Sequence, residues 1–174
     1  MSDLAYKSRF LFLSLAVLVL DQWTKWLVEV HLPRNVTEPV IPGVLNLVHV
    51  RNTGVAFGLF ASDHGASTWL LTALGVGALT AVAAYFWITP RGDRLLLVAL
   101  TLVAGGAVGN LLDRVASGAV TDFVDVYAGS YHWPAFNVAD SAITVGITLM
   151  IADSLLPRRR RVAAASPAAG EPAA

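Results

Sequence analysis

Four long apolar stretches limit how this chain of 174 residues can fold. They cover about residues 10–30, 66–88, 95–112 and 137–156, and the second carries no charged residue over its whole length. A helix that crosses a bilayer needs roughly 20 mostly apolar residues, so each stretch is long enough to span. Because 56% of the residues are hydrophobic and only 14% are charged, we predict a mainly α integral membrane protein with four transmembrane helices.

Two polar segments, residues 31–65 and 113–136, separate these spans and are predicted to form loops on the outer face. Pro and Gly residues punctuate β-branched residues in the first segment, which predicts short strands with turns. We expect one membrane domain over residues 1–157. Residues 158–174 begin with four arginines and continue as an Ala- and Pro-rich sequence, so we expect a basic, disordered tail there.

Positive charges indicate the orientation of the chain. No small-residue cleavage site follows the first apolar stretch, so we interpret it as an uncleaved span, and four spans place both termini on one side. Eight Lys or Arg residues fall on that side: Lys7, Arg9, Arg91, Arg94 and the four at 158–161. Three fall opposite: Arg34, Arg51 and Arg114. The positive-inside rule therefore predicts cytoplasmic termini and polar segments that face the outside.

The overall charge and the cysteine content exclude several classes of function. The formal net charge is zero, so nothing indicates a nucleic-acid partner. The chain has no Cys, which excludes disulfides, thiolate metal sites and a cysteine nucleophile. A metal site built from His132 and the neighbouring carboxylates is disfavoured, because no HExxH motif or comparable ligand spacing is present. Ser67 and Ser141 lack the G-x-S-x-G setting of a nucleophile, and no cofactor is expected.

Carboxylates are concentrated near the outer end of the last span. Four of the nine Asp residues fall within residues 105–140: Asp113, Asp122, Asp125 and Asp140. Asp140 lies about three residues into the last span, roughly 5 Å from its outer end. Asp122 or Asp125 can meet it if the outer loop folds back. Asp153 is excluded from the cluster, because it lies about 20 Å further along the same helix.

A pair of carboxylates in a partly dry site has a specific chemistry. Both cannot stay ionised, so they share one proton. One can then deprotonate a water while the other donates a hydrogen bond to a peptide carbonyl, as in aspartic proteases. Two alternatives remain open at this point. A proton-coupled carrier would use Asp21, Asp140 and Asp153, and in a structural subunit these side chains would merely cap helices.

Two sequence patterns concern helix packing. Asp21, Lys25 and Glu29 recur every four residues and share one helical face, which either forms an ion pair within the helix or faces the bundle interior. Gly105 and Gly109 form a small-xxx-small pattern that lets another helix approach closely. Aromatic residues also lie near the outer boundary, where such rings anchor membrane proteins: Trp23, Trp26 and Trp133.

Five sequence blocks occur in a distinctive order. They are DQWTK at 21–25, NTGVAF at 52–57, GGAVGNLLDR at 105–114, VTDF at 120–123 and WPAFNVAD at 133–140. Together, on a background of four spans, they resemble the bacterial lipoprotein signal peptidase family, also called signal peptidase II. Five blocks in the right order are far more specific than any one of them.

The resemblance implies an aspartic endopeptidase of the bacterial inner membrane. Such an enzyme removes the signal peptide from a prolipoprotein, on the amino side of a cysteine that carries diacylglycerol. The implied catalytic pair is Asp122 and Asp140. The resemblance thus selects Asp122 rather than Asp125 as the partner of Asp140. The active site would face the periplasm, beside a small β-cradle formed by residues 36–60. Partners would be the lipid-modified substrates and membrane lipid, and we expect the chain to act as a monomer.

Further positions match the family around the catalytic pair and are implied to bind substrate or support the site. They are Asp21, Lys25, Asn52, Gly54, Asn110, Asp113, Arg114 and Asn137. Asp113 and Arg114 are neighbours, so we expect them to form either a neutral pair that orients the site or a structural salt bridge. The three Asn residues can bind substrate backbone or the Asp side chains, or they can cap helices and turns.

Overall fold

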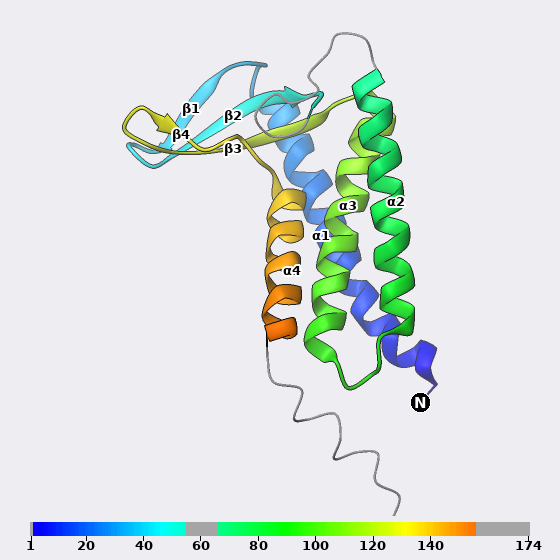
Figure 1. Cartoon of the computed structure of the whole chain (residues 1–174). Helices are drawn as coiled ribbons and strands as arrows, with labels where there is room; N and C mark the ends of the chain where they lie inside the picture. The colour runs from blue at the N-terminus through cyan, green and yellow to red at the C-terminus, as the bar shows by residue number, and fades with distance from the viewer. Residues whose placement is uncertain (1, 55–65, 156–174) are drawn as a thin grey trace, which may run out of the picture.

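Four helices form a bundle in the computed structural model, which describes residues 2–54 and 66–155 (Figure 1). They are α1 (Asp3–His31), α2 (Ala66–Ile88), α3 (Arg94–Ser117) and α4 (Val138–Leu155). Each contains a window that is long and apolar enough to cross a membrane, which confirms the four predicted transmembrane helices. The N-terminus and the end of α4 lie at the same end of the bundle. The tail expected at residues 158–174 lies outside the described residues.

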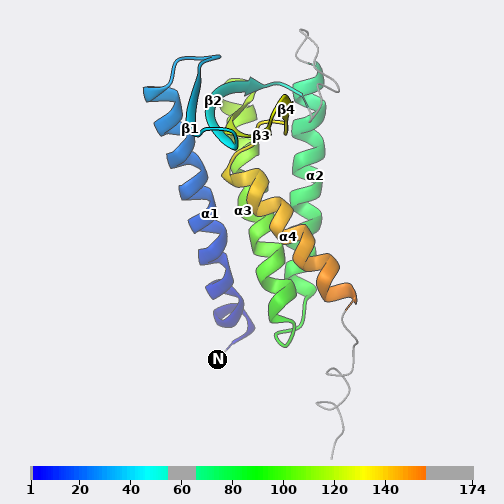
Figure 2. The same cartoon turned by 90° about the vertical axis from the view of Figure 1, so that its left-hand side faces the viewer.

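Helix α3 is the centre of the bundle. In its apolar window 50% of the residues are buried, compared with 11% in each of the other helices. A Cβ atom at Gly105 would lie 2.8 Å from the carbonyl oxygen of Ser14, and one at Gly109 would lie 2.5 Å from a carboxylate oxygen of Asp21. Both contacts are with α1, so the predicted close approach at these glycines is confirmed. Figure 2 shows α1 passing beside α3 along the bundle.

Replacing Gly106 with Ala is expected to destabilise the bundle, because this glycine faces α4. A Cβ there would meet the carbonyl oxygen of Ala139 and would lie 2.8 Å from Ile143 Cγ1. Overpacking of this kind costs about 1–3 kcal/mol, and thermal unfolding in detergent will measure the loss. Gly77→Ala on α2 is the matched control, since nothing lies within 4 Å of its Cβ position. Equal stability of the two variants would contradict this packing.

Two helices are longer than the sequence indicated. Helix α1 begins at Asp3 rather than near residue 10, because the Ser2 hydroxyl accepts a hydrogen bond of 3.2 Å from the Ala5 N–H and caps the helix. Helix α3 ends at Ser117 rather than Leu112. Gly118 stops it in a left-handed conformation with φ of 76°, which a glycine adopts without strain. The residues just after Leu112 are therefore helical rather than part of a loop.

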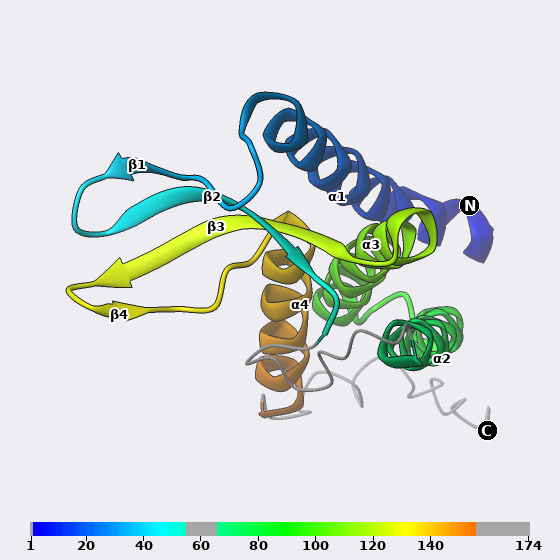
Figure 3. The same ribbon diagram turned by 90° about the horizontal axis from the view of Figure 1, so that it is seen from above.

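A four-stranded antiparallel sheet, which we call the β-cradle, lies at the end of the bundle opposite the N-terminus, here named the outer end (Figure 1). Its strands, in spatial order, are β1 (Thr37–Ile41), β2 (Leu45–Asn52), β3 (Val120–Ala128) and β4 (Tyr131–His132). Strands β1 and β2 lie in the segment where strands were predicted. Strands β3 and β4 come from residues 113–136, for which the sequence predicted only an outer loop. Seen from above, the sheet projects sideways beyond the helices (Figure 3).

Candidate active site

Asp122 lies on β3 and is almost completely buried, with 3% of its surface exposed. Both of its carboxylate oxygens accept a hydrogen bond from an asparagine side chain. Asn137 Nδ2 donates to Oδ1 at 2.8 Å, and Asn52 Nδ2 donates to Oδ2 at 2.9 Å. Burial raises the pKa of Asp122 to about 6; the nearby Asp140 carboxylate also raises this pKa, whereas the two amide donors lower it. Asp122 therefore titrates near neutral pH.

Asp140 lies in the first turn of α4 and is half-buried. The Asn137 backbone N–H donates to Asp140 Oδ2 at 3.2 Å, and the Asp140 N–H donates to Asn137 Oδ1 at 2.9 Å. This reciprocal pair has the form of a capping box, which satisfies backbone donors at the start of a helix. Asn110 Nδ2 donates to the other carboxylate oxygen at 2.7 Å. The carboxyl group is thus held at the outer end of α4.

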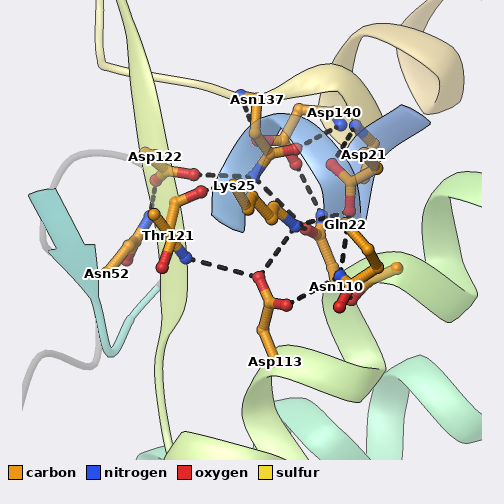
Figure 4. Close-up of polar contacts among 12 residues, drawn as sticks. Asp21, Gln22, Lys25, Asn52, Asn110, Asp113, Thr121, Asp122, Asn137 and Asp140 are labelled. Atoms are coloured by element: carbon orange, nitrogen blue, oxygen red, sulfur yellow. Dashed lines mark hydrogen bonds and ion pairs between the residues drawn. The ribbon is translucent and has the colours of Figure 1, made fainter. Parts of the chain in front are cut away.

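Asn137 joins the two carboxylates. It is fully buried, and one side chain donates to Asp122 while accepting from the Asp140 backbone. Its amide also lies 3.3 Å from Asn110 Oδ1. Figure 4 shows Asn137 between Asp122 and Asp140. Two carboxylates from different elements, β3 and α4, are therefore brought to one place, with an amide donor on each of their oxygens.

Lys25 anchors this arrangement from α1. The side chain is buried, and its ammonium group lies 2.7 Å from Asp21 Oδ2, 2.8 Å from Asp113 Oδ2 and 3.1 Å from Asn110 Oδ1. An ammonium group has three donors and no acceptor, so Asn110 must present its oxygen to Lys25. The amide nitrogen of Asn110 is then directed to Asp140. Lys25 thus fixes the orientation of a side chain that contacts the carboxylate pair.

Asp21 connects the same cluster to α4. It is fully buried, and its Oδ1 accepts a hydrogen bond of 2.9 Å from the Ala139 N–H, one of the free backbone donors of the first helical turn. Asp21 and Lys25 therefore form an ion pair within α1 and also face the bundle interior. The two interpretations left open by the sequence are both correct for these two residues, whereas Glu29, the third residue of the same helical face, is exposed.

The expected pairing of Asp113 with Arg114 is wrong. Adjacent residues on a helix point in different directions, and Asp113 pairs with Lys25 instead. Arg114 is half-buried and lies within electrostatic reach of Asp122 and Asp140. Among the residues described by the structure, the Arg114 side chain has no hydrogen-bond or ion-pair partner, although its backbone carbonyl accepts from the Gly118 N–H. It lies beside the carboxylate pair without being part of the hydrogen-bond network.

Gly54 and Asn52 form a local turn beside Asp122. The Gly54 N–H donates to Asn52 Oδ1 at 3.0 Å. Because this contact uses the amide oxygen, the Asn52 nitrogen is left to donate to Asp122. Gly54 itself is buried. These two predicted site residues therefore act together on the same carboxylate, and the turn belongs to the kind that Asn favours.

Asp125 is directed away from the pair. Its carboxylate accepts a hydrogen bond of 2.8 Å from Asn46 and lies 2.9 Å from His132 Nδ1. Residues three apart on a strand point to opposite faces, so Asp122 and Asp125 cannot share a site. The geometry thus separates two residues that sequence spacing left as alternatives.

The other candidate chemistries gain no support from the structure. No group of three or more His, Asp or Glu side chains within residues 2–54 and 66–155 is placed to hold a metal ion. Ser141 donates its hydroxyl hydrogen to the Asn137 carbonyl oxygen at 2.9 Å, as a helix residue does. Helix α4 continues from Asp140 past Asp153 to Leu155, which confirms that Asp153 lies near the opposite end.

Three residues support the site without having been assigned a role from the sequence. Gln22 Nε2 donates to Asp113 Oδ1 at 2.9 Å. Thr121 is buried, and its hydroxyl donates to Glu29 Oε1 at 2.6 Å. Glu29 could have been recognised from the sequence, because it shares a helical face with Asp21 and Lys25. Nothing in the sequence pointed to Thr121, because its partner lies on a distant element.

The chain is similar to known proteins over most of its length. A family model described as signal peptidase II matches residues 13–156. The lipoprotein signal peptidase of Solibacter usitatus is 45% identical over 147 residues, which cover 83% of this chain and 88% of that protein. The lipoprotein signal peptidase of Cupriavidus necator is 46% identical over 150 residues, covering 84% and 83% of the two chains.

The fold is also similar to that of a solved protein. A structure of a bacterial membrane enzyme superposes with a TM-score of 0.74 at 32% identity, covering 85% of this chain and 88% of that one. The four apolar helices and this similarity describe a multi-pass membrane protein. With the family match over residues 13–156, they show that this chain belongs to the signal peptidase II family of membrane peptidases.

Proposed function

We propose that this protein is a membrane aspartic endopeptidase that removes signal peptides from diacylglyceryl-modified prolipoproteins. The observation that carries the proposal is the linkage of Asp122 and Asp140 through Asn137, at the outer end of the bundle. The relatives named lipoprotein signal peptidase supply the substrate class. The expected cleavage lies on the amino side of the lipidated cysteine, which membrane lipid holds close to the catalytic pair.

In the proposed mechanism the two carboxyl groups share one proton. We assign this proton to Asp122, the more deeply buried of the two carboxyl groups, and Asp140 accepts a proton from water as the water oxygen attacks the peptide carbonyl carbon. Asp122 donates its proton to the carbonyl oxygen. When the C–N bond breaks, Asp140 protonates the leaving nitrogen and a hydroxyl of the intermediate returns a proton to Asp122. No metal or cofactor enters these steps.

The supporting residues have positioning roles in this proposal. Asn52, held by Gly54, and Asn137 orient Asp122, while Asn110 orients Asp140. Lys25 sets the direction of Asn110, and it is itself held by ion pairs with two carboxylates, Asp21 and Asp113. Arg114 adds a positive charge beside the pair, where a peptide carbonyl develops negative charge.

The proposed location is the bacterial inner membrane. The excess of Lys and Arg at the end that holds both termini supports a cytoplasmic position for them. The catalytic pair and the β-cradle then face the periplasm, where the modified cysteine of a precursor lies. We propose that the chain acts as a monomer.

Cleavage of a purified substrate tests the proposed function. The protein in detergent is incubated with a diacylglyceryl-modified prolipoprotein, and mass spectrometry follows the product. We expect a shortened protein that begins with the lipidated cysteine. The same precursor without the lipid is the matched control and should be cut poorly. Failure to cut the lipidated precursor, or a cut at another bond, would contradict the proposal.

The rate of cleavage should depend on pH in the way that a shared proton requires. Below about pH 6 Asp122 is protonated, so the pair holds its proton. Above this pH both carboxyl groups are ionised, and kcat/KM should fall about tenfold per pH unit. It should also fall at low pH, when the base becomes protonated. A flat profile between about pH 4 and 9 would argue against the pair.

Two asparagines of β2 provide a matched comparison for this profile. Asn52 donates to Asp122, and Asn46 donates at a similar distance to Asp125. Asn52→Ala removes a donor that favours the charged carboxylate, so the pKa of Asp122 should rise and the alkaline decline should move to higher pH. Asn46→Ala should leave the profile unchanged. The same shift in both variants would show that Asn52 does not act through Asp122.

A further inference from the structure

The end of the β2–β3 ladder carries the Asp122 carboxylate and one of its amide donors on the same face. Asn52 pairs with Val120, and Asp122 lies two residues beyond Val120 on β3. Alternate residues of a strand share a face, so Asn52 and Asp122 are diagonal neighbours across the two strands. Their hydrogen bond of 2.9 Å spans this diagonal (Figure 4). The contact therefore depends on how β2 and β3 are aligned.

Only a short piece of ladder sets this alignment. Strands β2 and β3 shift register between Leu47 and Val50, and three residue pairs follow before β2 ends at Asn52. An irregularity of this kind bends a strand and disrupts the ladder locally, and the ends of elements open more readily than their centres. Side-chain contacts outside the ladder thus contribute to keeping Asn52 and Asp122 together.

The opposite face of the same ladder carries a contact with α1. Arg51 and Thr121 are a cross-strand pair, and adjacent residues of a strand point to opposite faces, so this pair is directed away from the diagonal. The Thr121 hydroxyl donates to Glu29 Oε1 at 2.6 Å, and Arg51 Nη1 lies 3.6 Å from the same oxygen. Glu29 lies in the last turn of α1. One carboxylate oxygen of α1 therefore bridges β2 and β3.

The Thr121 contact is the stronger arm of this bridge. Thr121 is 1% exposed, so its hydroxyl is removed from water and depends on Glu29 for an acceptor. The ion pair of Arg51 with Glu29 is longer and partly open to solvent, which weakens it. Arg51 Nη2 also donates to the Ser117 carbonyl oxygen at 3.0 Å, at the end of α3. Thr121 thus ties β3 to α1, while Arg51 ties β2 to α3.

We infer that Glu29 is a positioning residue for the catalytic pair. By bridging β2 and β3, Glu29 keeps the strands in the alignment in which Asn52 donates to Asp122. Its effect passes through the backbone of the two strands, from one face of the ladder to the other. The inference rests on the proposed function, because the alignment matters for cleavage only if Asp122 takes part in the reaction.

Two substitutions of Glu29 separate its acceptor from its charge. Glu29→Ala removes the acceptor, whereas Glu29→Gln keeps a carbonyl oxygen for the Thr121 hydroxyl and loses only the charge. With Glu29→Ala, kcat on the diacylglyceryl-modified precursor should fall about tenfold at unchanged KM; a displacement of about 1 Å costs about a hundredfold, but Asn137 still holds Asp122. Glu29→Gln should keep most of the rate. Glu38→Ala, at an exposed glutamate of the edge strand β1, is the matched control and should cleave at the unmodified rate.

A titration that requires no cleavage separates positioning from a structural role. Carbon-13 NMR of the Asp carboxyl groups in detergent follows Asp122, whose signal is identified by its loss in Asp122→Asn. Burial raises the pKa of Asp122 and the Asn52 donor opposes this, so a loosened contact should raise the pKa further in Glu29→Ala. Removal of a negative charge alone would lower it. The other charged groups that interact with Asp122 are unchanged in this variant: Asp140 on α4, Lys25 on α1 and Arg114 on α3.

A double variant completes the test. If Glu29 acts through the Asn52 contact, Glu29→Ala combined with Asn52→Ala should cleave no more slowly than Asn52→Ala alone. Additive losses, or an unchanged pKa of Asp122 in Glu29→Ala, would overturn the inference and leave Glu29 with a structural role only. Thr121→Val removes the same hydrogen bond while keeping the shape of the side chain, so it should also raise the pKa of Asp122 and serves if Glu29→Ala does not fold; an unchanged pKa there would equally overturn the inference. An unmodified protein that cuts no precursor would contradict the proposed function, whereas the titration would still report on the positioning.

Discussion

Asp122→Asn and Asp140→Asn will each abolish cleavage of a lipid-modified precursor. General acid–base catalysis by a positioned side chain contributes about 10²–10⁴-fold, and an amide can neither hold the shared proton nor accept one from water. The shape of the side chain is retained, so insertion and folding should survive. Initial rates on a diacylglyceryl-modified precursor, together with thermal unfolding in detergent, will separate lost chemistry from lost structure.

Two further Asp→Asn variants serve as controls. Asp125→Asn alters the carboxylate on the opposite face of β3, which is paired with Asn46 and His132. Asp153→Asn alters the same helix as Asp140, near its other end. Both variants should cleave at close to the unmodified rate. Full activity of Asp122→Asn or Asp140→Asn would remove the basis for an aspartic mechanism, and inactivity of Asp125→Asn would show that the wrong residue of β3 was chosen.

Lys25→Met should have the next largest effect, because it removes the group that orients Asn110. Removing one partner of a buried ion pair costs about 3–5 kcal/mol, since Asp21 and Asp113 are left uncompensated. Misplacement of a catalytic group by about 1 Å costs on the order of a hundredfold in rate. We therefore expect losses of both stability and kcat/KM, measured by thermal unfolding and by initial rates.

A double variant separates these two losses. Lys25→Met with Asp113→Asn restores the balance of charge, so stability should recover in part, while activity stays low because Asn110 still lacks its partner. Lys7→Met is the matched control. Lys7 is the other buried lysine of α1, paired with Asp3 near the opposite end, and its loss should reduce stability but leave the activity of the folded fraction unchanged. Recovery of full activity in the double variant would show that Lys25 stabilises the fold but does not position Asn110 for catalysis.

The position of each carboxylate along the membrane normal could be predicted from sequence, because helix rise converts residue number into depth. Asp140 indeed lies in the first turn of α4, with the outer carboxylates, and Asp153 lies near the opposite end of the same helix. Depth alone could not choose between Asp122 and Asp125, which lie in one polar segment. That choice came from a family resemblance, and the strand alternation of β3 supplies its physical reason: the two side chains leave opposite faces of the sheet.

Partners of the charged residues were predicted less well. Because Asp113 and Arg114 are adjacent and oppositely charged, the sequence suggested an ion pair between them. Both residues lie within α3, however, and adjacent side chains on a helix point in different directions. The ion pair of Asp113 with Lys25 joins α3 to α1, and the hydrogen bond of Thr121 to Glu29 joins β3 to α1. Contacts of this kind depend on how elements pack, which local patterns do not encode.

The sequence by itself determined the four spans and the kinds of residue available for chemistry, because the length and hydrophobicity of a segment are local properties of the chain. The tertiary structure decided how β3 joins β2 in one sheet and how Asn137 brings Asp122 to Asp140. It also decided that Lys25, from the first helix, directs an asparagine of the third toward a carboxylate of the fourth. These relations require helix packing at close-fitting glycines, and so they exist only once the bundle has formed.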